Sequence, residues 1–248
     1  MSKRYPCADL SARLPSLSFF FPAYNEEGNV EAVVSDALHT LPRFADDIEV
    51  IIVDDGSRDR TPEIADALVA SDARVRVVHH GKNRGYGGAV RSGLLASRKA
   101  FTFYTDGDRQ FRLDDVPRLI DALDGVDAAI GYREKRRDPW RRLFTAWVYN
   151  RLIRVLFGSR LRDVDCAFKL FRREVFERVP LDQVRSNGAF FSAEMLLTLR
   201  ERGVTMREVA IPHYPRTVGE NTGASVKVTL RAIRDLIRLR LRLWGLPL

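Results

Sequence analysis

Short apolar runs alternate with amphipathic helical patterns along the first half of the chain. The apolar runs predict strands at residues 17–21, 48–53, 74–79, 101–105 and 127–131. Apolar residues spaced three and four apart predict helices between them, at 30–41, from 61 onward, at 85–98 and at 114–123. Within the second of these helices, Thr61 is expected to be the N-cap and Pro62 the first helical residue. Strands separated by helices of this length imply an α/β fold with a doubly wound, mostly parallel sheet and flanking helices.

The second half of the chain is less regular. It contains a basic loop at 133–142, an amphipathic helical pattern at 144–155 and an irregular or strand segment at 163–171. A helix at 192–202 and a strand at 204–211 follow, and a basic amphipathic helix is expected at 225–244. We therefore divide the chain into an N-terminal extension (1–16), a single α/β domain (17–215) and a C-terminal basic amphipathic tail (216–248).

Composition narrows the classes of partner. The chain has 248 residues, enough for one well-packed α/β domain, and a net charge of +8. A basic surface suits an anionic partner such as nucleic acid, anionic lipid or a phosphorylated substrate, and charge alone does not choose among them. The two cysteines argue against a disulfide scaffold and fit a reducing compartment. With no signal-peptide pattern and no apolar window long enough to span a bilayer, we expect a cytoplasmic protein that can also bind the inner face of the membrane peripherally.

Polar clusters follow four consecutive predicted strands. They are Tyr24-Asn25-Glu26, Asp54-Asp55-Gly56-Ser57, the stretch 80–88 and Asp106-Gly107-Asp108. In doubly wound sheets, ligands bind beyond the carboxyl ends of the strands. Four clusters at this edge indicate a ligand site more strongly than any one of them alone.

The Asp106-Gly107-Asp108 cluster has the chemistry of a metal site. Two carboxylates one residue apart in a turn can both face a hard cation, and Gly107 lets the turn tighten. Mg²⁺ or Mn²⁺ held by one or two carboxylates keeps coordination positions open for diphosphate oxygens, and Gln110 adds a neutral oxygen. An isolated D-x-D is more often a solvated turn, and Asp163-Val164-Asp165 is a second one. Asp106 is favoured because it directly follows a buried-looking strand.

Two further clusters have alternative interpretations. The carboxylate of Asp54 suits hydrogen bonds from a base or ribose, but the same segment also fits an ordinary strand–helix turn with a cap. The glycine-rich stretch 81–88, with Lys82 and Arg84, would let backbone amides approach a phosphate. It matches neither a Walker loop nor a Rossmann fingerprint, so it is weak when taken alone.

Together these segments resemble the family 2 glycosyltransferases, and within them the dolichyl- or polyprenyl-phosphate sugar synthases. The resemblance spans roughly residues 17–240 in the family's order. The matching segments are 21–27, 53–61, 83–91, 106–110, 163–169, Glu194-Met195 and 213–216. Three features depart from the pattern: Ala167 replaces Gly or Ser, Arg109 replaces a small residue, and the membrane helices of many relatives are absent from the sequence.

The resemblance implies a GT-A fold, inversion at the anomeric carbon and a divalent metal, Mg²⁺ or Mn²⁺. Asp108 and Gln110 would hold the metal, and Asp106 would lie near both the metal and the donor's ribose and diphosphate. Lys169 would lie near the sugar and acceptor together with Asp163 and Phe168, and Arg216 would meet phosphate. The residues expected to bind the nucleotide sugar are Pro22, Ala23, Tyr24, Glu26, Asp54, Asp55, Lys82, Gly85, Arg91 and Asp106.

The acceptor decides whether a general base is needed. A phosphate monoester has its second pKa near 6, so a polyprenyl phosphate is already largely dianionic at neutral pH. A hydroxyl acceptor, on a polysaccharide or a small molecule, must instead lose a proton, and Asp163 or Glu194 would take it. The alternative for Asp163 is a structural ion pair with a nearby arginine, and for Glu194 a helix N-terminal acid.

The basic segments suggest a membrane contact. We expect the loop at 133–142 and the C-terminal helix to face an anionic membrane, because Trp140, Trp147 and Trp244 accompany their positive charge. A solvated basic face or a dimer contact is the alternative, and the sequence leaves the oligomeric state open.

Two other functional classes fit less well. A sugar nucleotidyltransferase would have a basic, glycine-rich triphosphate loop after the first strand, whereas this chain has Tyr24-Asn25-Glu26-Glu27. A nucleic-acid-binding module would explain the charge but not the carboxylates that follow three of these strands, which repel phosphate. We therefore expect an inverting glycosyltransferase that uses a UDP- or GDP-linked sugar and, as acceptor, a polyprenyl phosphate, and that binds no nucleic acid. The sugar and the base remain open.

Overall fold

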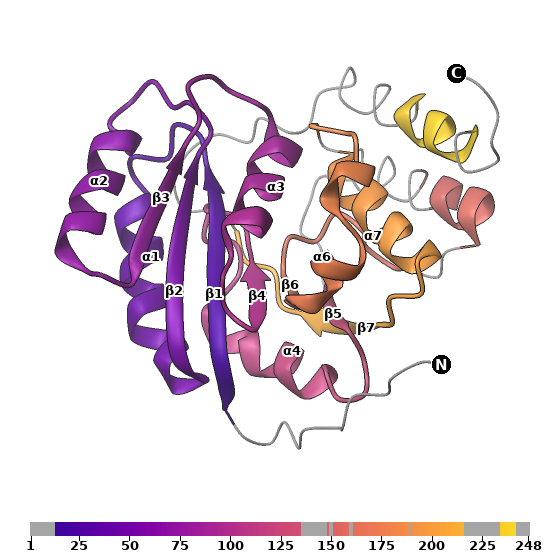
Figure 1. Ribbon diagram of the computed structural model, residues 1–248, viewed down its shortest axis with the longest axis horizontal. Helices are drawn as coiled ribbons and strands as arrows, with labels where there is room; N and C mark the ends of the chain where they lie inside the picture. Colours follow the sequence, from indigo (N-terminus) through magenta and orange to yellow (C-terminus); the bar gives the residue numbers. More distant parts are fainter. Residues whose placement is uncertain are drawn as a thin grey trace.

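One mixed sheet organises the protein (Figure 1). The computed structural model describes residues 13–134, 148, 151–158, 161–188, 190–215 and 234–241. In these residues, seven strands form a sheet in the order β3-β2-β1-β4-β6-β5-β7. All neighbouring strands are parallel except β6, which runs antiparallel to β4 and β5, so the expected mostly parallel sheet is confirmed. The strands are β1 (Leu14–Ala23), β2 (Ala45–Asp54), β3 (Val75–His79), β4 (Phe101–Tyr104), β5 (Ala128–Arg133), β6 (Lys169–Arg172) and β7 (Met206–Ile211).

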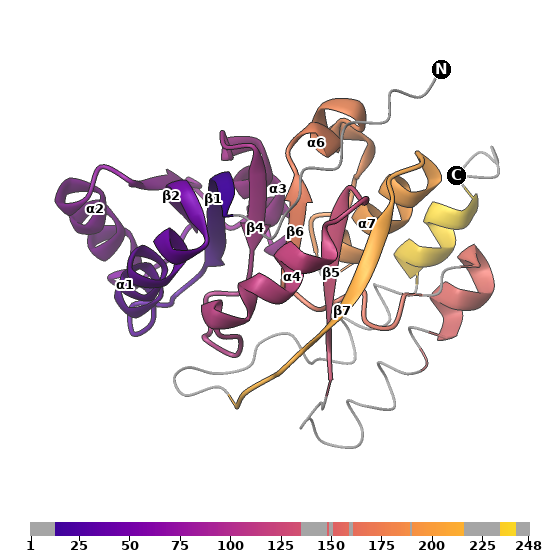
Figure 2. The same ribbon diagram turned by 90° about the horizontal axis from the view of Figure 1, so that it is seen from below.

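Helices cover both faces of the sheet, as Figure 2 shows from below. Helices α1 (Val30–Thr40), α2 (Thr61–Ser71) and α4 (Val116–Ala122) pack on one face. Helices α3 (Tyr86–Ala96), α6 (Glu174–Arg178) and α7 (Phe191–Glu201) pack on the other. Short 3₁₀ turns lie at η1 (Leu41–Arg43), η2 (Leu113–Asp115) and η3 (Leu181–Gln183).

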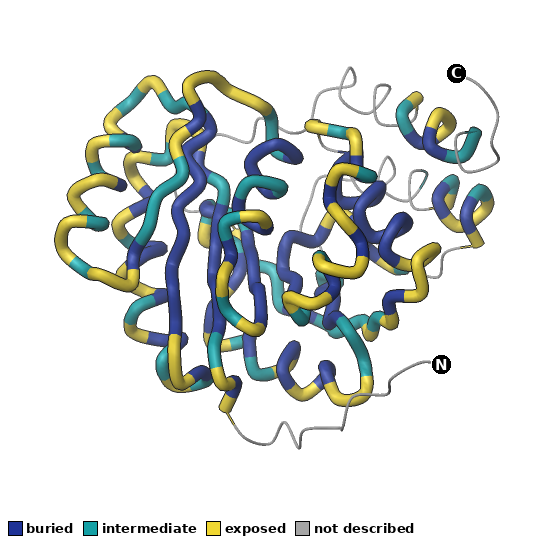
Figure 3. Tube along the Cα trace, in the orientation of Figure 1, coloured by how far each residue is buried: buried dark blue, intermediate teal, exposed yellow. Residues whose placement is uncertain are grey.

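The central strands are apolar on both sides because both faces are covered. In β1, Phe19 and Phe21 join the core on the α1 side and Phe20 joins the core on the α3 side. A near-continuous apolar run is typical of a parallel strand buried between two helical layers. Figure 3 shows these strands buried along most of their length, whereas loops at the edge where β1 and β2 end are exposed.

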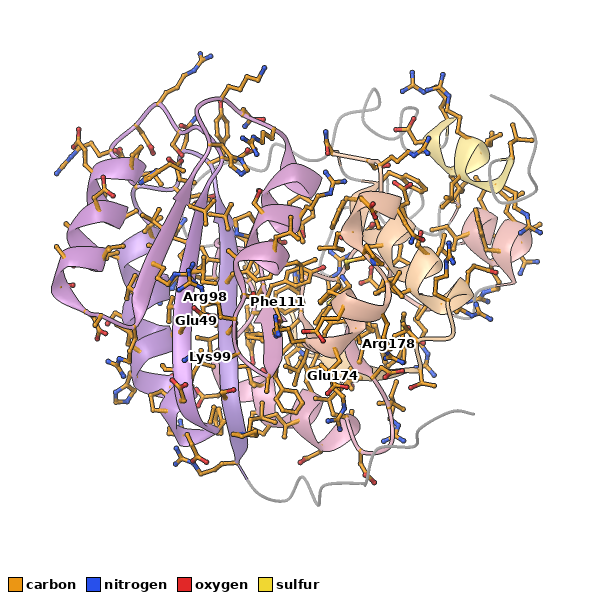
Figure 4. The ribbon with its side chains drawn as sticks, viewed as in Figure 1. Glu49, Arg98, Lys99, Phe111, Glu174 and Arg178 are labelled. Atoms are coloured by element: carbon orange, nitrogen blue, oxygen red, sulfur yellow. The ribbon has the colours of Figure 1, made fainter. Side chains whose placement is uncertain are left out.

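A buried polar cluster crosses the α3 side of the sheet. The Glu49 carboxylate accepts hydrogen bonds from Ser18 Oγ (2.6 Å), the Arg98 amide (2.7 Å) and Arg76 Nη1 (2.7 Å). Figure 4 shows Glu49 and Arg98 together, with Lys99 close by. Burial alone would raise the pKa of Glu49, but these hydrogen bonds outweigh it and lower the pKa. The cluster ties β1, β2 and β3 to the turn that precedes β4.

The first predicted strand is longer in the structure than in the sequence analysis. β1 begins at Leu14, inside the stretch assigned to an N-terminal extension at 1–16, and it continues through Pro22 to Ala23. β4 pairs with β1 only as far as Phe20, so at Pro22 the strand has a described neighbour on one side, β2. Proline is tolerated where a strand lies at an edge.

The predicted start of α2 needs a correction. Thr61 is the first residue of the helix rather than its cap, and its amide donates to Asp59 Oδ1 (3.0 Å). The Thr61 hydroxyl instead accepts a hydrogen bond from the Glu26 amide (2.9 Å). This threonine therefore links the loop after β1 to the start of α2.

The second half contains the predicted elements where it is described. Residues 151–157 are helical and overlap the amphipathic helix predicted at 144–155, and residues 234–241 are helical within the stretch 225–244, most of which lies outside the described residues. Most of the predicted basic loop and most of the C-terminal tail lie outside the described residues. No helix in the described part is both long and apolar enough to cross a membrane.

We predict that Gly93→Ala destabilises the fold, because α3 lies against β1 at this glycine. A Cβ atom at Gly93 would be 2.2 Å from Cδ2 of Phe20, so the buried ring would have to move. We expect a loss of about 1–3 kcal/mol in the free energy of unfolding, measured by urea denaturation. Gly188→Ala is the matched control, since a Cβ there has no atom within 4 Å. Equal stability of the two variants would contradict the described packing.

Candidate active site

A cleft opens where β1, β2 and β3 end. Ala23, Asp54 and His79 are partners across these three parallel strands, so the loops that follow them start side by side. The cleft has a volume of about 430 Å³. Its lining residues are Tyr24, Asp54, Gly56, Ser57, Arg58, Pro62, His79, His80, Gly81, Lys82 and Asn83. Of the residues expected to bind the nucleotide sugar, Tyr24, Asp54 and Lys82 line this cleft, and the other seven lie outside its lining.

The loop after β1 is hydrogen-bonded to the loop after β2. Asn25, in the left-handed region (φ 54°), donates its amide to Ser57 Oγ (3.0 Å) and accepts from the Arg58 amide (2.8 Å). The Glu26 carboxylate accepts from Asn29 Nδ2 (2.6 Å). These contacts leave Tyr24 at the rim, 41% exposed, with a ring that can stack on a planar ligand.

Asp54 and Asp55 have different positions although they are adjacent in sequence. Asp54 faces the cleft, where Oδ1 accepts from the Ser57 amide (2.9 Å) and Oδ2 lies 2.8 Å from His79 Nδ1. Asp55 is bound to the glycine-rich turn instead. Its carboxylate accepts from the amides of Arg84 (2.8 Å) and Gly85 (2.9 Å), and Oδ1 lies 2.6 Å from His80 Nδ1. Asp54 therefore belongs to the cleft wall, and Asp55 shapes the turn.

Four amides of the glycine-rich turn are hydrogen-bonded within the protein. The amides of Gly87 and Gly88 donate to the carbonyl of Asn187 (2.8 and 3.4 Å), and those of Arg84 and Gly85 donate to Asp55. A Cβ at Gly87 would lie 2.4 Å from Cβ of Phe191, and one at Gly85 (φ 82°) would lie 2.6 Å from the Asn187 carbonyl oxygen. These glycines thus allow the close approach of the segment that precedes α7.

Arg91 holds that same segment. Its guanidinium donates to Asn187 Oδ1 (2.6 Å) and to the carbonyls of Val184 (2.5 Å) and Ser186 (2.9 Å), and it lies over the Phe191 ring. We expected Arg91 to bind the nucleotide sugar. In the structure its guanidinium donates hydrogen bonds within residues 184–187.

Asp106 and Asp108 follow β4 in a tight turn. A Cβ at Gly107 would be 3.0 Å from the Phe21 ring and 3.1 Å from the Pro22 carbonyl oxygen, so this turn packs against the end of β1. Asp106 Oδ1 is buried without a hydrogen-bond partner. Burial, and secondarily the charge of Asp108, raises the pKa of Asp106 to about 7.

These residues fit a divalent cation. A buried carboxylate oxygen without a partner and a second carboxylate two residues away would both be stabilised by a hard cation. Gln110 is fixed by its side-chain Nε2, which donates to the Tyr214 carbonyl (3.1 Å), and by its own carbonyl, which accepts from the Tyr214 amide (2.9 Å). Among the described residues no group of three His, Cys, Asp or Glu side chains forms a metal site. A cation here would therefore take its remaining ligands from neutral oxygens, water or a diphosphate.

The acids expected near the acceptor are both engaged. Asp163 forms a two-pronged ion pair with Arg133, with distances of 2.6 Å from Nε and 2.8 Å from Nη2. Burial alone would lower the pKa of Arg133, but the Asp163 carboxylate outweighs it and raises that pKa. Glu194 is fully buried and accepts from the Ser186 amide (2.8 Å). The first aspartate of the second D-x-D motif, Asp163, is thus part of an ion pair with Arg133.

Lys169 is a buried cation beside the Asp106 turn. It is fully buried, its Nζ donates to the Cys166 carbonyl, and it lies 5.5 Å from the centroid of the Tyr104 ring. Its charge lowers the pKa of Asp106 and so opposes the effect of burial. Arg216, expected to meet phosphate, lies outside the described residues.

Comparison with known proteins decides the family. Residues 18–179 match the model of the family described as Glycosyl transferase family 2. The chain belongs to this family. It is therefore a glycosyltransferase, and its sheet and helices are those of the GT-A fold.

Two relatives illustrate the similarity within family 2. The chain is 34% identical over 254 residues to "Glycosyltransferase AglD" of Haloferax volcanii, an alignment that covers 98% of this chain and 39% of that protein. It is 33% identical over 226 residues to the polyprenol monophosphomannose synthase of Mycolicibacterium smegmatis, covering 86% of this chain and 84% of that enzyme. The chain thus spans well under half of the first relative and most of the second.

A solved structure confirms the fold. Glucosyl-3-phosphoglycerate synthase from Mycobacterium tuberculosis, in complex with Mn²⁺, UDP-glucose and phosphoglyceric acid, superimposes with a TM-score of 0.71. The match covers 100% of this chain and 86% of that chain at 19% identity, a level that shows the shared fold.

Four residues that hold the candidate site together were missed by the sequence analysis. Neither His79 nor His80 is among the candidates named from the sequence, yet each contacts a strand-end aspartate. Their position gave a usable signal, because they directly follow a parallel strand at the ligand-binding edge. Arg133 and Asn187 gave no such signal, because their partners are distant in sequence.

We predict that Asp55→Asn destabilises the protein by about 3 kcal/mol, because it removes a buried charge that accepts hydrogen bonds from two amides. The measurement is the free energy of unfolding from urea denaturation. Asp46→Asn is the control: this carboxylate forms an ion pair with Arg13, is 65% exposed, and should contribute less than about 1 kcal/mol. If the Asp55 variant were as stable as the control, the anchoring of the glycine-rich turn would be wrong.

Proposed function

We propose that this glycosyltransferase moves a sugar from a nucleotide-diphosphate sugar to a polyprenyl phosphate, with inversion at the anomeric carbon. The observation that carries the choice of acceptor is the engagement of both acids expected to serve as a general base. Asp163 is paired with Arg133, and Glu194 is buried against the Ser186 amide. A hydroxyl acceptor must lose a proton to such a base, whereas a phosphate acceptor is largely ionised at neutral pH. The name of the mycobacterial relative, a polyprenol monophosphomannose synthase, supports the same acceptor class.

The cleft is the proposed site of the donor nucleotide. Tyr24 would stack on the base from the rim, and the Asp54 carboxylate would accept a base N–H. Arg58 and Lys82 line the same cleft and supply positive charge for the phosphates. We assign Pro22, Ala23 and Glu26 to the walls behind these residues, and Asp55, Gly85 and Arg91 to holding the glycine-rich turn and the segment before α7.

The diphosphate and the metal belong at the Asp106 turn. Asp106, Asp108 and Gln110 would hold Mg²⁺ or Mn²⁺, both of which prefer oxygen ligands. When bound, the cation would neutralise the charge that develops on the departing nucleotide diphosphate. The buried ammonium of Lys169 lies beside the same turn and adds positive charge from the protein itself.

The acceptor phosphate would approach from the side of Lys169 and the Arg133–Asp163 pair. Catalysis then consists mainly of positioning the acceptor oxygen in line with the leaving group and stabilising that group. Arg216 is proposed to contact a phosphate, on the strength of its sequence motif.

A basic helix pair is the proposed membrane contact. Arg240 lies over the Phe157 ring, which places helix 234–241 against helix 151–157, and the two lie side by side in Figures 1 and 2. Val155 and Ile237 are exposed, at 68% and 49%. The exposed arginines on the same helices are Arg151, Arg154, Arg234 and Arg238. Apolar tips among arginines suit an anionic lipid surface, where a polyprenyl phosphate resides. We accordingly propose peripheral association with the cytoplasmic membrane face, to which the tail at 216–248 contributes.

We predict that the protein transfers sugar to polyprenyl phosphate in the presence of Mn²⁺ or Mg²⁺, and not to the matching polyprenol. The assay measures nucleotide release across UDP- and GDP-sugars, with and without each acceptor. Asp108→Asn should abolish turnover, because one of two cation-binding carboxylates is lost. Asp121→Asn, an exposed carboxylate on α4, is the control and should behave as wild type.

Equal transfer to the polyprenol would refute the phosphate acceptor. Wild-type rates and unchanged metal dependence in Asp108→Asn would refute the metal assignment. Pyrophosphate release from a nucleoside triphosphate would instead indicate a sugar nucleotidyltransferase.

We predict that the wild-type protein floats with anionic liposomes and that Val155→Asp combined with Ile237→Asp reduces flotation about tenfold or more. The double variant removes the apolar tips and adds two negative charges at the surface. Leu95→Asp is the control, since Leu95 is 69% exposed on a different helix, α3. Wild type that stays with the soluble fraction, or a control that loses flotation equally, would exclude this surface as the membrane contact.

A further inference from the structure

His79 lies between two carboxylates at the edge of the cleft. Its Nδ1 is 2.8 Å from Asp54 Oδ2 and its Nε2 is 3.2 Å from Asp66 Oδ1. Carboxylates accept hydrogen bonds and do not donate them when ionised, and neutral imidazole has a single N–H. A neutral ring would therefore satisfy one carboxylate and direct a lone pair at the other. Both hydrogen bonds form only when both ring nitrogens carry a proton.

The charged surroundings of His79 favour that imidazolium. Asp54 faces it from the end of β2 and Asp66 faces it from α2, while Arg58 and Lys82 are the cations of the same cleft. The adjacent His80 is turned away, toward Asp55 and Ser92. Burial alone would lower the pKa of His79, but the hydrogen bonds to Asp54 and Asp66 outweigh it, so the pKa lies above its ordinary value of 6.5.

His79 also determines how Asp54 is held. One Asp54 oxygen accepts the Ser57 amide and the other meets His79, while the residue itself is only 2% exposed. A carboxylate has about four acceptor positions, so both oxygens retain capacity for a ligand. The backbone fixes one oxygen permanently, and the imidazolium fixes the other only while it stays protonated.

We propose that His79 is a positioning residue for the donor's base: as an imidazolium bridging Asp54 and Asp66, it holds the Asp54 carboxylate in the orientation that accepts the N–H of the base. The inference rests on the proposed function, in which Asp54 meets the base. Base affinity is then greatest at low pH and falls as the pH rises through the pKa of His79. Asp66 is 68% exposed and lies outside the cleft lining, so it does not touch the ligand. Its charge influences the pH at which His79 loses its proton and the affinity for the base falls.

The first test is a proton NMR titration of the four histidines, with His79→Gln identifying the His79 signal. In wild type the His79 midpoint should lie above 6.5. Asp66→Asn keeps an acceptor oxygen but removes the charge, so the midpoint should move to lower pH. Glu63→Gln is the matched control: it removes a charge from the same helix, and Glu63 pairs with Arg60 rather than His79.

The second test measures the affinity for uridine and guanosine from about pH 5.5 to about pH 8.5, the range in which an imidazole titrates. Nucleosides carry no phosphate, so neither phosphate ionisation nor a metal enters the result. Wild-type affinity should weaken about threefold to tenfold with rising pH, the effect of one hydrogen bond, at the midpoint seen by NMR. The midpoint should shift in Asp66→Asn and stay in Glu63→Gln, and His79→Gln should show no inflection.

The possible outcomes distinguish a failure of this inference from a failure of the proposed function on which it rests. A shifted His79 midpoint with nucleoside affinity independent of pH would overturn the positioning role and leave the donor site intact. If the His79 midpoint were the same in Asp66→Asn as in wild type, the proposed bridge from Asp54 through His79 to Asp66 would be overturned. If neither the nucleosides nor their diphosphates bound at any pH, the proposed donor site would fail together with the inference.

Discussion

Buried carboxylates at the carboxyl edge of the sheet are the constraint on which this site depends. An ionised carboxylate away from water must be paired or hydrogen-bonded, or it takes up a proton. Asp54, Asp55, Asp163 and Glu194 each meet this requirement through protein partners: a backbone amide, a histidine or an arginine. Asp106 differs, because its Oδ1 is buried without a hydrogen-bond partner and its pKa is raised to about 7, although Tyr86 forms a hydrogen bond with its carboxyl group and the charge of Lys169 opposes the shift. The same physical rule thus separates four carboxylates that are satisfied by protein partners from one whose ionised form a bound cation would stabilise.

The glycines follow from the same architecture. The glycines of the turn before α3 allow it to pack against the backbone of Asn187, which is distant in sequence. The Arg91 side chain donates a hydrogen bond to the same residue. The contact joins the turn before α3 to the segment that leads into α7. A larger residue at Gly87 would push Phe191 away, so this glycine is needed for the packing of the turn against the start of α7.

The sequence predicted the repeating part of the fold because that part has strong periodic signals. Long apolar strands between amphipathic helices located β1 to β5 to within a few residues, and polar clusters after the first four strands located the binding edge. The sequence could not show that Asp54 lines the cleft while Asp55 binds the glycine-rich turn. The direction of each side chain depends on how the chain turns after β2, which the sequence pattern does not reveal. The sequence left Asp163 open between a candidate base and an ion pair with a nearby arginine, because no local pattern shows that Arg133, thirty residues earlier, pairs with it. Boundaries failed where tertiary contacts overrode local preference, as at Pro22 and Thr61.

The short antiparallel strand β6 explains why residues from the second half reach the binding edge at all. Had β6 been parallel to β4, its carboxyl end would lie at that edge and Lys169 at the opposite one. Because it runs in reverse, its first residue, Lys169, pairs with Tyr104 at the end of β4, next to the Asp106 turn. The segment just before it, with Asp163, reaches Arg133 at the end of β5 for the same reason. The sequence left residues 163–171 open between an irregular segment and a strand and gave no direction for it, yet the reversed direction of β6 brings the buried Lys169 to the Asp106 turn.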